Sequence, residues 1–343
     1  MTATQTRELR YRDAHSEALR QEMRRDPSII VMGEDVAGGA GRAHLGIIDA
    51  WQVPLAATKG LIQEFGPQRV LDTPISEAGF MGTAVGAALT GMRPVVELMY
   101  IDFLGTCLDQ LLNNAAKVRY MLGGQAKVPL TVFCRIGAGV GAAAQHSESL
   151  YSILTHIPGL KCVAPSDAYT CKGLMISAIR DDDPVVVCNH KALLSRSGPV
   201  PEEPYALPLG KGRILRPGRD VTLVGIAYTT HVCLEAAERL AQEGVDAEVV
   251  DLLSLSPLDE ELIMESVSRT GRLAVVDEDT PRCSVARDIA ATVADRGFDR
   301  LKAPIKCVNA PHAPVPYSRP LEQAYIPSAA RVVAAVHEQL RRK

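Results

Sequence analysis

Short runs of continuously apolar residues alternate with helical patterns along the chain, and this alternation limits the folds that the sequence can adopt. In the first half the apolar runs cover residues 28–35, 69–76, 93–100, 128–137, 160–166 and 184–191. Helical patterns lie between them at residues 11–25, from 77 onward, 102–121 and 167–182. Strands that are apolar on both faces are typical of parallel sheets with helices on both sides. The sequence therefore predicts an α/β fold with parallel-type sheets flanked by helices.

A stretch rich in proline and glycine, residues 191–220, interrupts the alternation and indicates a boundary between two domains. Beyond it the apolar runs 221–227, 247–253, 272–279 and 305–311 again alternate with helical patterns, and the last helix is expected over 328–342. A length of 343 residues also exceeds what one ordinary core covers. We predict a first domain over 1–195, a linker over 196–219 and a smaller second domain over 220–343.

The composition argues against nucleic acids and membranes as partners. Lys and Arg number 37 and Asp and Glu 40, and aromatic residues make up 4% of the chain. Without a basic excess the chain lacks an electrostatic footprint for polyanions, and few aromatic rings are present for base stacking. No apolar stretch reaches the roughly 20 residues of a membrane-spanning helix. The N-terminal residues lack an apolar signal core, and their acids fit a mitochondrial transit peptide poorly.

The chain has eight cysteines, and none of them forms a C-x-x-C pair. Cys134, Cys162, Cys188 and Cys307 each stand singly within an apolar run. This usage is typical of small buried side chains in a reducing compartment. We therefore expect a protein of the cytoplasm.

The stretch LDTPISEAGFMGTAVGAALTGMRPVVEL, residues 71–98, places one carboxylate, Glu77, at the start of a helix of small residues. An acid in the first turn, after a residue such as Ser76 that can cap the helix, is common for structural reasons alone. The small residues from Gly79 to Gly91 indicate tight helix packing or a close backbone approach. The pattern alone leaves a structural and a catalytic interpretation of Glu77 open.

A glycine-rich loop, residues 137–142, follows an apolar run and has the form G-x-G-x-x-A. Such a loop can bind a dinucleotide, but the residues after it are polar and lack the apolar helix that a dinucleotide loop opens. His146 lies at the end of the loop and is either an acid–base group or a surface histidine bonded to its neighbours. A Ser-His hydrolase is not indicated, because the chain has no G-x-S-x-G elbow.

Metal-ligand patterns are weak. His146 and His156 are too far apart to share a helical face, and no H-E-x-x-H occurs. Asn113 and Asn114 match part of a motif for diphosphate and Mg²⁺, but no G-D-G precedes them. We therefore interpret the two asparagines as amides on a helix surface.

Several segments together resemble the β subunit of the thiamine-diphosphate-dependent first component of 2-oxo acid dehydrogenase complexes. The segments are VMGEDV (31–36), DTPISEAGFMGTAVGAALTGMRPVVE (72–97), DFLGTCLDQLLNNAAKVRYMLGG (102–124) and AAAQHSESLYSILTHIPGLKCVAPSDAYTCKGLMISAIRDDDPVV (142–186). With VVDLLSLSPLDEELI (249–263), the similarity runs from about residue 29 to 326. ELMYIDFLGTCLDQ, GAGVGAAAQHSESLY, DEDTPRCSVARDIAA and APHAPVPYS are most similar to the acetoin dehydrogenase branch.

The resemblance implies a domain that binds the aminopyrimidine of thiamine diphosphate, followed by a transketolase C-terminal-like domain. It also implies an α2β2 heterotetramer in which the α subunit holds the diphosphate and Mg²⁺ through its own G-D-G…N-N motif. The implied reaction cleaves acetoin to acetaldehyde and a cofactor-bound two-carbon unit. That unit is then transferred to lipoamide on a separate acyltransferase core.

The resemblance also assigns roles to residues of this chain. Glu77 matches the acid that hydrogen-bonds N1′ of the aminopyrimidine, and Phe103 matches the aromatic residue that stacks on that ring. Ile75 is expected to line the same pocket. His146 matches a loop histidine near the substrate, where it can donate a proton or stabilise a developing alkoxide.

A structural potassium site is a further implication of the resemblance. The matching positions are Leu130, Ala178, Ile179, Asp181 and Asp183, the last of which is often Asn in relatives.

Three rival functions remain open from the sequence. They are decarboxylation of pyruvate or of a branched-chain 2-oxo acid, a nicotinamide-dependent Rossmann oxidoreductase that uses the loop at Gly137, and a scaffold that only docks the acyltransferase core.

Overall fold

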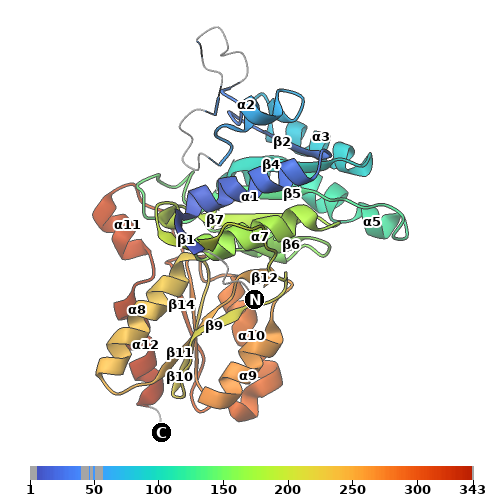
Figure 1. The fold of residues 1–343 in the computed structure, drawn as a ribbon. Coiled ribbons are helices and arrows are strands. Elements are labelled where there is room, and N and C mark those ends of the chain that lie inside the picture. Colours follow the sequence, from blue (N-terminus) through green and yellow to red (C-terminus); the bar gives the residue numbers. More distant parts are fainter. Residues whose placement is uncertain (1–5, 40–45, 47–48, 51–56, 342–343) are drawn as a thin grey trace. The chain divides into compact units, whose positions relative to one another are not determined.

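The computed structural model describes residues 6–39, 46, 49–50 and 57–341 (Figure 1). The chain forms two compact units. The first contains residues 1–136, 153–189 and 193–209, and the second contains 137–152, 190–192 and 210–343. The chain therefore passes into the second unit twice before residue 210, whereas the sequence suggested one cut near residue 195.

The first unit is built on a parallel sheet whose neighbouring strands follow the order β6-β7-β5-β4-β2-β3. Val31 lies opposite both Val70 and Val95, so the three strands β3, β2 and β4 are in one register. Every residue of β2, β5 and β7 is buried, as expected for strands covered on both faces. The strands are β2 (Ile29–Gly33), β3 (Val70–Asp72), β4 (Arg93–Tyr100), β5 (Thr131–Ile136), β6 (Lys161–Val163) and β7 (Val185–His190).

Helices α1 (Tyr11–Arg25) and α7 (Ala168–Arg180) pack side by side on this sheet (Figure 1). Asp167 caps α7 by accepting the Thr170 N–H at 2.7 Å, in a reciprocal capping box. The other helical segments are α2 (Leu61–Phe65), α3 (Glu77–Leu89), η2 (Ile101–Phe103), α4 (Leu104–Asp109), η3 (Gln110–Ala115), α5 (Val118–Met121), α6 (Tyr151–Thr155) and η4 (Lys191–Leu193).

One helix expected from the sequence, 102–121, is divided into a 3-10 turn, an α-helix, a π-helical stretch and a last α-helical turn. Asn113 and Asn114 lie in the π-helical stretch η3. Their amides donate to Asp109 at 2.6 Å and Gln110 at 3.1 Å, each four residues earlier. The interpretation of these asparagines as helix-surface amides agrees with the structure.

The second unit has a sheet in the order β14-β13-β10-β11-β9, in which β9 runs antiparallel to β11. Apolar side chains of α8 and α12 pack with those of the central strands in one buried cluster. The strands are β9 (Arg213–Arg216), β10 (Val221–Gly225), β11 (Ala247–Asp251), β12 (Ser254–Ser256), β13 (Leu273–Asp277) and β14 (Lys306–Asn309). The helices are α8 (Tyr228–Gln242), α9 (Glu260–Thr270), α10 (Val285–Gly297), η5 (Phe298–Arg300), α11 (Arg319–Tyr325) and α12 (Ala329–Leu340).

The fold class predicted from the sequence is confirmed, with two local differences. The stretch 196–219, expected as a linker, contains β8 (Ser197–Pro201) and β9. β8 pairs antiparallel with β1 (Thr6–Arg10), which the sequence pattern did not indicate. Among the eight cysteines, Cys307 is half-buried rather than buried, and Cys283 is exposed.

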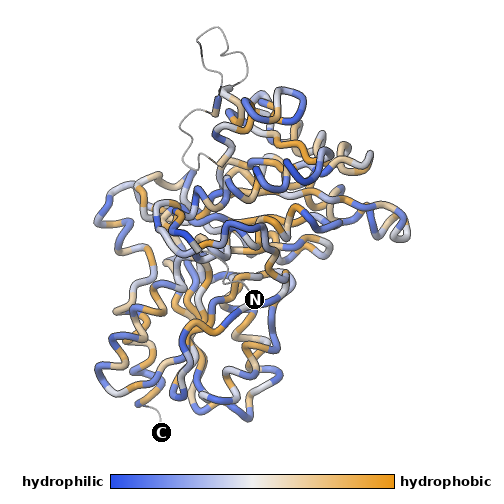
Figure 2. Tube along the Cα trace, in the orientation of Figure 1, coloured by the Kyte–Doolittle hydropathy of each residue, from blue (hydrophilic) through white to orange (hydrophobic). Residues whose placement is uncertain are grey.

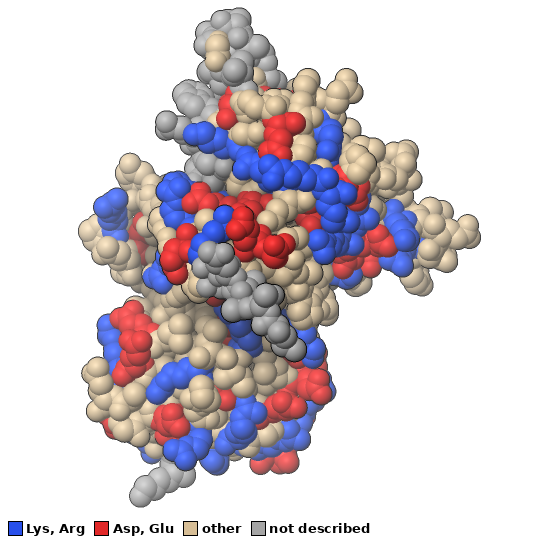
Figure 3. Space-filling view, in the orientation of Figure 1, with Lys and Arg blue, Asp and Glu red and all other residues tan. Residues whose placement is uncertain are grey.

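The surface agrees with the charge balance of the sequence. In Figure 2 helix α1 is mainly hydrophilic, since its outer face carries most of its arginines. Figure 3 shows Lys and Arg interspersed with Asp and Glu on the face in view. Within the described part of the chain, no helix combines the length and the apolar character needed to cross a bilayer.

Candidate active site

Glu77 is the first residue of α3 and is half-buried, four residues after the loop that leaves β3 begins. The loop is anchored by Asp72, whose carboxylate accepts the N–H groups of Ala37 at 2.7 Å and Gly39 at 2.5 Å. Two successive strand ends, β2 and β3, are thereby held together beside the start of α3. The acid therefore stands at the carboxyl edge of a parallel sheet, where α/β proteins commonly bind ligands.

Ser76 precedes the helix but does not cap it in the way the sequence suggested. Its side chain makes no capping hydrogen bond to the described first turn, and its carbonyl accepts the Phe80 N–H at 3.0 Å. The positive end of the α3 dipole therefore interacts with the carboxylate of Glu77 and can also interact with a group that binds beside it.

The small residues of α3 serve close packing at some positions only. A Cβ at Gly82 would lie 3.0 Å from Oε1 of Gln110, the end of a flexible side chain that would have to shift slightly. At Gly86 a Cβ would meet no described atom within 4 Å. Packing is therefore tight at Gly82 and does not explain the glycine at 86.

Helices α3 and α4 pack against each other, and Cys107 is a buried residue of α4. Burial first, and the charge of Glu77 second, raise the pKa of the Cys107 thiol to about 12. Phe103 is the last residue of η2, directly before α4, and α4 packs against α3, whose first residue is Glu77. That Glu77 and Phe103 line one pocket stays a prediction.

Phe103 packs on Tyr100, which in turn contacts the Arg135–Glu97 ion pair. Its ring meets the Tyr100 ring edge to face, with centroids 5.7 Å apart and planes at 79°. The guanidinium of Arg135 lies 5.0 Å from the Tyr100 centroid and forms a fully buried ion pair with Glu97. Ile75 is 75% exposed, so it is open to a ligand or to another subunit.

His146 lies in the second unit, on a loop whose backbone repeatedly enters the left-handed region. The φ angles of Gly137, Gly139, Gly141 and Ala143 are +84°, +104°, +72° and +59°. Such alternation turns successive N–H groups toward one side and forms an anion-binding concavity. At Gly137 a Cβ would lie 1.9 Å from Nε2 of His190, so only glycine fits there.

Two buried carboxylates of the protein fill this concavity. Glu278 accepts the Ala138 N–H at 2.5 Å. Glu322 accepts the N–H of Gly139 at 2.7 Å and that of Gly141 at 3.0 and 3.1 Å. The N–H groups with which a dinucleotide loop would bind a pyrophosphate are therefore already paired with carboxylates.

Acids at the end of β13 also hold the start of α6. Tyr151 and Ser152 donate their hydroxyl protons to Asp277 and Asp279, respectively. Burial, and then the negative charge of Asp277, raise the pKa of Asp279 to about 7. Burial also raises the pKa of Asp277. No sequence pattern indicates these contacts, because the acids lie more than 120 residues from their partners.

Known proteins are similar to this chain over nearly its whole length. The transketolase pyrimidine-binding domain matches residues 7–196, and the transketolase C-terminal domain matches residues 210–332. The β subunit of acetoin:2,6-dichlorophenolindophenol oxidoreductase from Bacillus subtilis is 54% identical, with 96% of each chain covered. The protein of the same name from Cupriavidus necator is 53% identical, with 98% of each chain covered.

This chain belongs to the family of thiamine-diphosphate-dependent dehydrogenase β subunits. Another relative, the pyruvate dehydrogenase E1 component subunit β of Rickettsia felis, is 43% identical over 95% of this chain and 96% of its own. A solved structure titled split gene transketolase, inactive beta4 tetramer, has a TM-score of 0.76 at 26% identity, covering 97% of this chain and 99% of that one. The family inferred from the sequence motifs is confirmed.

The residues for which the family resemblance implied potassium lie together in the first unit. Leu130 precedes β5 and its carbonyl accepts the Val185 N–H at 2.9 Å, while the other residues stand at the end of α7. Nζ of Lys161 lies 2.7 and 2.8 Å from the Asp181 carboxylate oxygens and 3.3 Å from Asp183. The carboxylates of Asp181 and Asp183 are thus already paired with the ammonium of Lys161.

The carbonyls at the potassium positions also have donors. Arg93 donates to the carbonyl oxygen of Ile179 at 2.9 Å and to that of Asp181, and the Ala178 carbonyl accepts the Asp181 N–H at 3.3 Å. Arg119 pairs with Asp183. This donor set fits an internal ammonium better than an added monovalent ion, and the potassium site stays a prediction.

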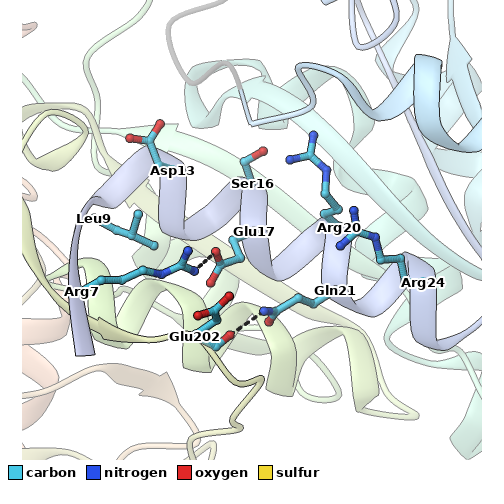
Figure 4. Close-up of a pocket in the computed structure, with 9 residues that line it drawn as sticks. All are labelled: Arg7, Leu9, Asp13, Ser16, Glu17, Arg20, Gln21, Arg24 and Glu202. Atoms are coloured by element: carbon cyan, nitrogen blue, oxygen red, sulfur yellow. Dashed lines mark hydrogen bonds and ion pairs between the residues drawn. The ribbon is translucent and has the colours of Figure 1, made fainter. Parts of the chain in front are cut away.

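Two hollows on the described surface do not include these residues. One of about 430 Å³ lies along α1 (Figure 4), where Arg7 pairs with Glu17 and Gln21 donates to the Glu202 carbonyl. The lining has three arginines (Arg7, Arg20, Arg24) and three acids (Asp13, Glu17, Glu202), so the hollow is balanced in charge. In the part of the chain that the structure describes, no cluster of three His, Cys, Asp or Glu is suited to a metal ion.

Proposed function

We propose that this chain is the β subunit of an acetoin dehydrogenase first component. In this proposal the complex cleaves acetoin to acetaldehyde and passes the remaining two-carbon unit to lipoamide. The observation that supports it is the half-buried acid Glu77 at the start of α3, which packs against α4, with the half-buried ring of Phe103 directly before α4. The relatives at 53% and 54% identity, both named for acetoin, support this substrate.

The arrangement fits the aminopyrimidine ring of thiamine diphosphate. The ring has a nitrogen edge, which suits a carboxyl group, and two faces, which suit an aromatic side chain. When bound, this cofactor supplies a carbon nucleophile that adds to a carbonyl and stores the two-carbon unit. In this proposal Glu77 would hydrogen-bond N1′ of the ring, Phe103 would stack on its face, and Ile75 would cover the pocket.

His146 acts on the substrate side. An imidazole on a loop can donate a proton to the substrate oxygen as negative charge develops there, or stabilise that charge as a hydrogen-bond donor. The half-buried position of His146 leaves part of the side chain open for this role.

An α subunit completes the site in this proposal. The chain has no G-D-G segment, so the diphosphate and Mg²⁺ would be held by the partner, in an α2β2 heterotetramer. A lipoyl-bearing acyltransferase core would take up the two-carbon unit. The three relatives described above are named as β subunits, which supports an α partner.

Pyruvate is the second candidate substrate, because pyruvate dehydrogenase β subunits are 43% identical to this chain. A nicotinamide-dependent reaction has less support, since Glu278 and Glu322 occupy the N–H groups of the glycine-rich loop. A scaffold without catalysis would have no use for the acid at the start of α3 and the aromatic ring before α4.

The decisive experiment is coexpression with its α partner, followed by dye reduction. Rates would be measured on acetoin, pyruvate and 2-oxoisovalerate, with and without thiamine diphosphate and Mg²⁺. We expect cofactor-dependent dye reduction with the highest kcat/KM on acetoin. A higher kcat/KM on pyruvate would refute the substrate assignment, and an activity that needs NAD instead of thiamine diphosphate would refute the proposed function.

A further inference from the structure

The loop that carries His146 is held from several elements by charged groups inside the second unit. Glu322, on α11, is 2% exposed, and Glu278, just after β13, is 4% exposed. Lys191 is 6% exposed and donates to the carbonyl oxygen of His146 and, at 3.1 Å, to the hydroxyl of Ser147. The loop is therefore bonded near its start, at its turn and at the histidine itself.

The Glu278 contact extends to a second histidine with a defined tautomer. Nδ1 of His190 accepts the Ala192 N–H at 3.2 Å, so the ring proton lies on Nε2, which donates to Glu278 at 2.9 Å. The His190 ring also stacks on Tyr228, with centroids 5.1 Å apart. The hydrogen bond from His190 thus also holds in place the Glu278 carboxylate that accepts the Ala138 N–H.

Apolar packing alone does not demand two carboxylates here. Ala138 lies in a small buried cluster with Ala310, Val315 and Tyr325, which already anchors the start of the loop. Burying a carboxylate is costly unless its oxygens find donors, and Glu322 receives the N–H groups of Gly139 and Gly141. These contacts fix the segment whose left-handed turns determine where His146 emerges.

We propose that Glu322 is a positioning residue for His146: its carboxylate clamps the turn at Gly139 and Gly141 and so holds the imidazole toward the substrate. Glu278 and Lys191 complete the clamp on either side. The inference rests on the proposed function, since it deepens the role given there to His146. Glu322 itself does not touch substrate or cofactor in this assignment.

The test uses the complete αβ complex with Glu322→Gln, which keeps the shape but loses the charge. Its carbonyl oxygen can replace Oε1, but its amide takes the place of Oε2 and sets a donor against the Gly141 N–H. We expect kcat on acetoin to fall by about tenfold to a hundredfold, the range for lost hydrogen bonds to a charged group. The dissociation constant for thiamine diphosphate should stay unchanged, because Glu77 and Phe103 are intact. Glu261→Gln, the same change on a side chain that is 77% exposed, is the matched control.

A double-mutant cycle separates positioning from general structural damage. If Glu322 acts through His146, the combination of Glu322→Gln with His146→Ala should be no slower than His146→Ala alone. If Glu322→Gln lowers kcat by the same factor in both backgrounds, the positioning role is refuted.

Hydrogen exchange distinguishes failure of the clamp from failure of the proposed function. The amides of Gly139 and Gly141 should exchange slowly in the wild-type complex and at least about tenfold faster in Glu322→Gln. Unchanged exchange would overturn the clamp whatever the substrate. Faster exchange in a complex that turns over no 2-oxo acid and no acetoin would uphold the clamp and refute the proposed function instead.

Discussion

The carboxylate of Glu77 lies near the buried thiol of Cys107, and burial followed by this charge raises the pKa of the thiol to about 12. The thiol therefore stays protonated at physiological pH and adds no second negative charge beside the acid. Glu77 is half-buried at the start of α3 and so keeps part of its side chain accessible. This relationship leads to the first prediction.

Glu77→Gln should reduce thiamine-dependent dye reduction by at least about a hundredfold, since acid–base groups contribute roughly 10²–10⁴. The fold should be retained, because Glu77 is only half-buried and glutamine is accepted in a first helical turn. Steady-state rates and thermal midpoints of the αβ complex check both parts. Glu203→Gln, on an exposed side chain of the same unit, should have no effect. Retained activity would mean that Glu77 only starts the helix.

Phe103→Leu should weaken thiamine diphosphate binding while leaving the complex assembled. Loss of one aromatic contact is worth about 0.5–1.5 kcal/mol, which corresponds to a roughly twofold to tenfold higher dissociation constant. Phe103→Tyr keeps the ring and should bind nearly as the wild type does. Isothermal titration of the apo complex with the cofactor measures the difference. Equal affinity of the leucine and tyrosine variants would place Phe103 in the core and not in the pocket.

The raised pKa of Asp279 leads to a prediction about how stability depends on pH. Its pKa is raised from the model-compound value of 3.8 to about 7, chiefly by burial, so the folded state holds this proton more tightly than the unfolded state does. The resulting stabilisation is complete below about pH 4 and is lost as the pH rises through about 7. Asp279→Asn cannot lose the proton, so it should gain stability relative to wild type over that interval, by on the order of a few kcal/mol.

Thermal midpoints of the complex between pH 4.5 and 8 would show this effect as a difference that grows with pH. Asp288→Asn, on the exposed side of α10, should give a difference that does not change in this interval. A flat difference for Asp279→Asn as well would show that this carboxyl titrates normally.

The pairing of the Lys161 ammonium with Asp181 and Asp183 leads to a prediction about potassium. Because this ammonium already bridges Asp181 and Asp183, we expect the wild-type midpoint to be equal in KCl and NaCl of the same strength. Lys161→Met should lose about 1 kcal/mol and recover part of it in KCl only. Lys127→Met, which removes an exposed ammonium paired with Asp182, should show no potassium dependence. Stabilisation of the wild type by KCl alone would establish an ion bound beside Lys161.

The sequence predicted those features that depend on neighbouring residues. Helix α1 begins at Tyr11 and ends at Arg25, as its apolar spacing indicates, and Glu77 does begin a helix. The clamp on the His146 loop was not predictable, because Glu322 lies 183 residues after Gly139 in a stretch without periodicity. Likewise β1 pairs with β8 through backbone groups, whose partners no side-chain pattern specifies.

Two glycines with nearly the same φ angle provide a final test of the packing in the first unit. Gly91 and Gly159 have φ angles of +98° and +97°. At Gly91 an added Cβ meets no described atom within 4 Å, whereas at Gly159 it would lie 2.1 Å from the carbonyl oxygen of Ala116. Gly91→Ala should therefore cost only the backbone strain, about 1–2 kcal/mol. Gly159→Ala should cost roughly 1–3 kcal/mol more, because backbone must move. Thermal melts of the two variants in the αβ complex measure this difference, and equal midpoints would show that the loop at Gly159 does not pack on η3 as the structure describes.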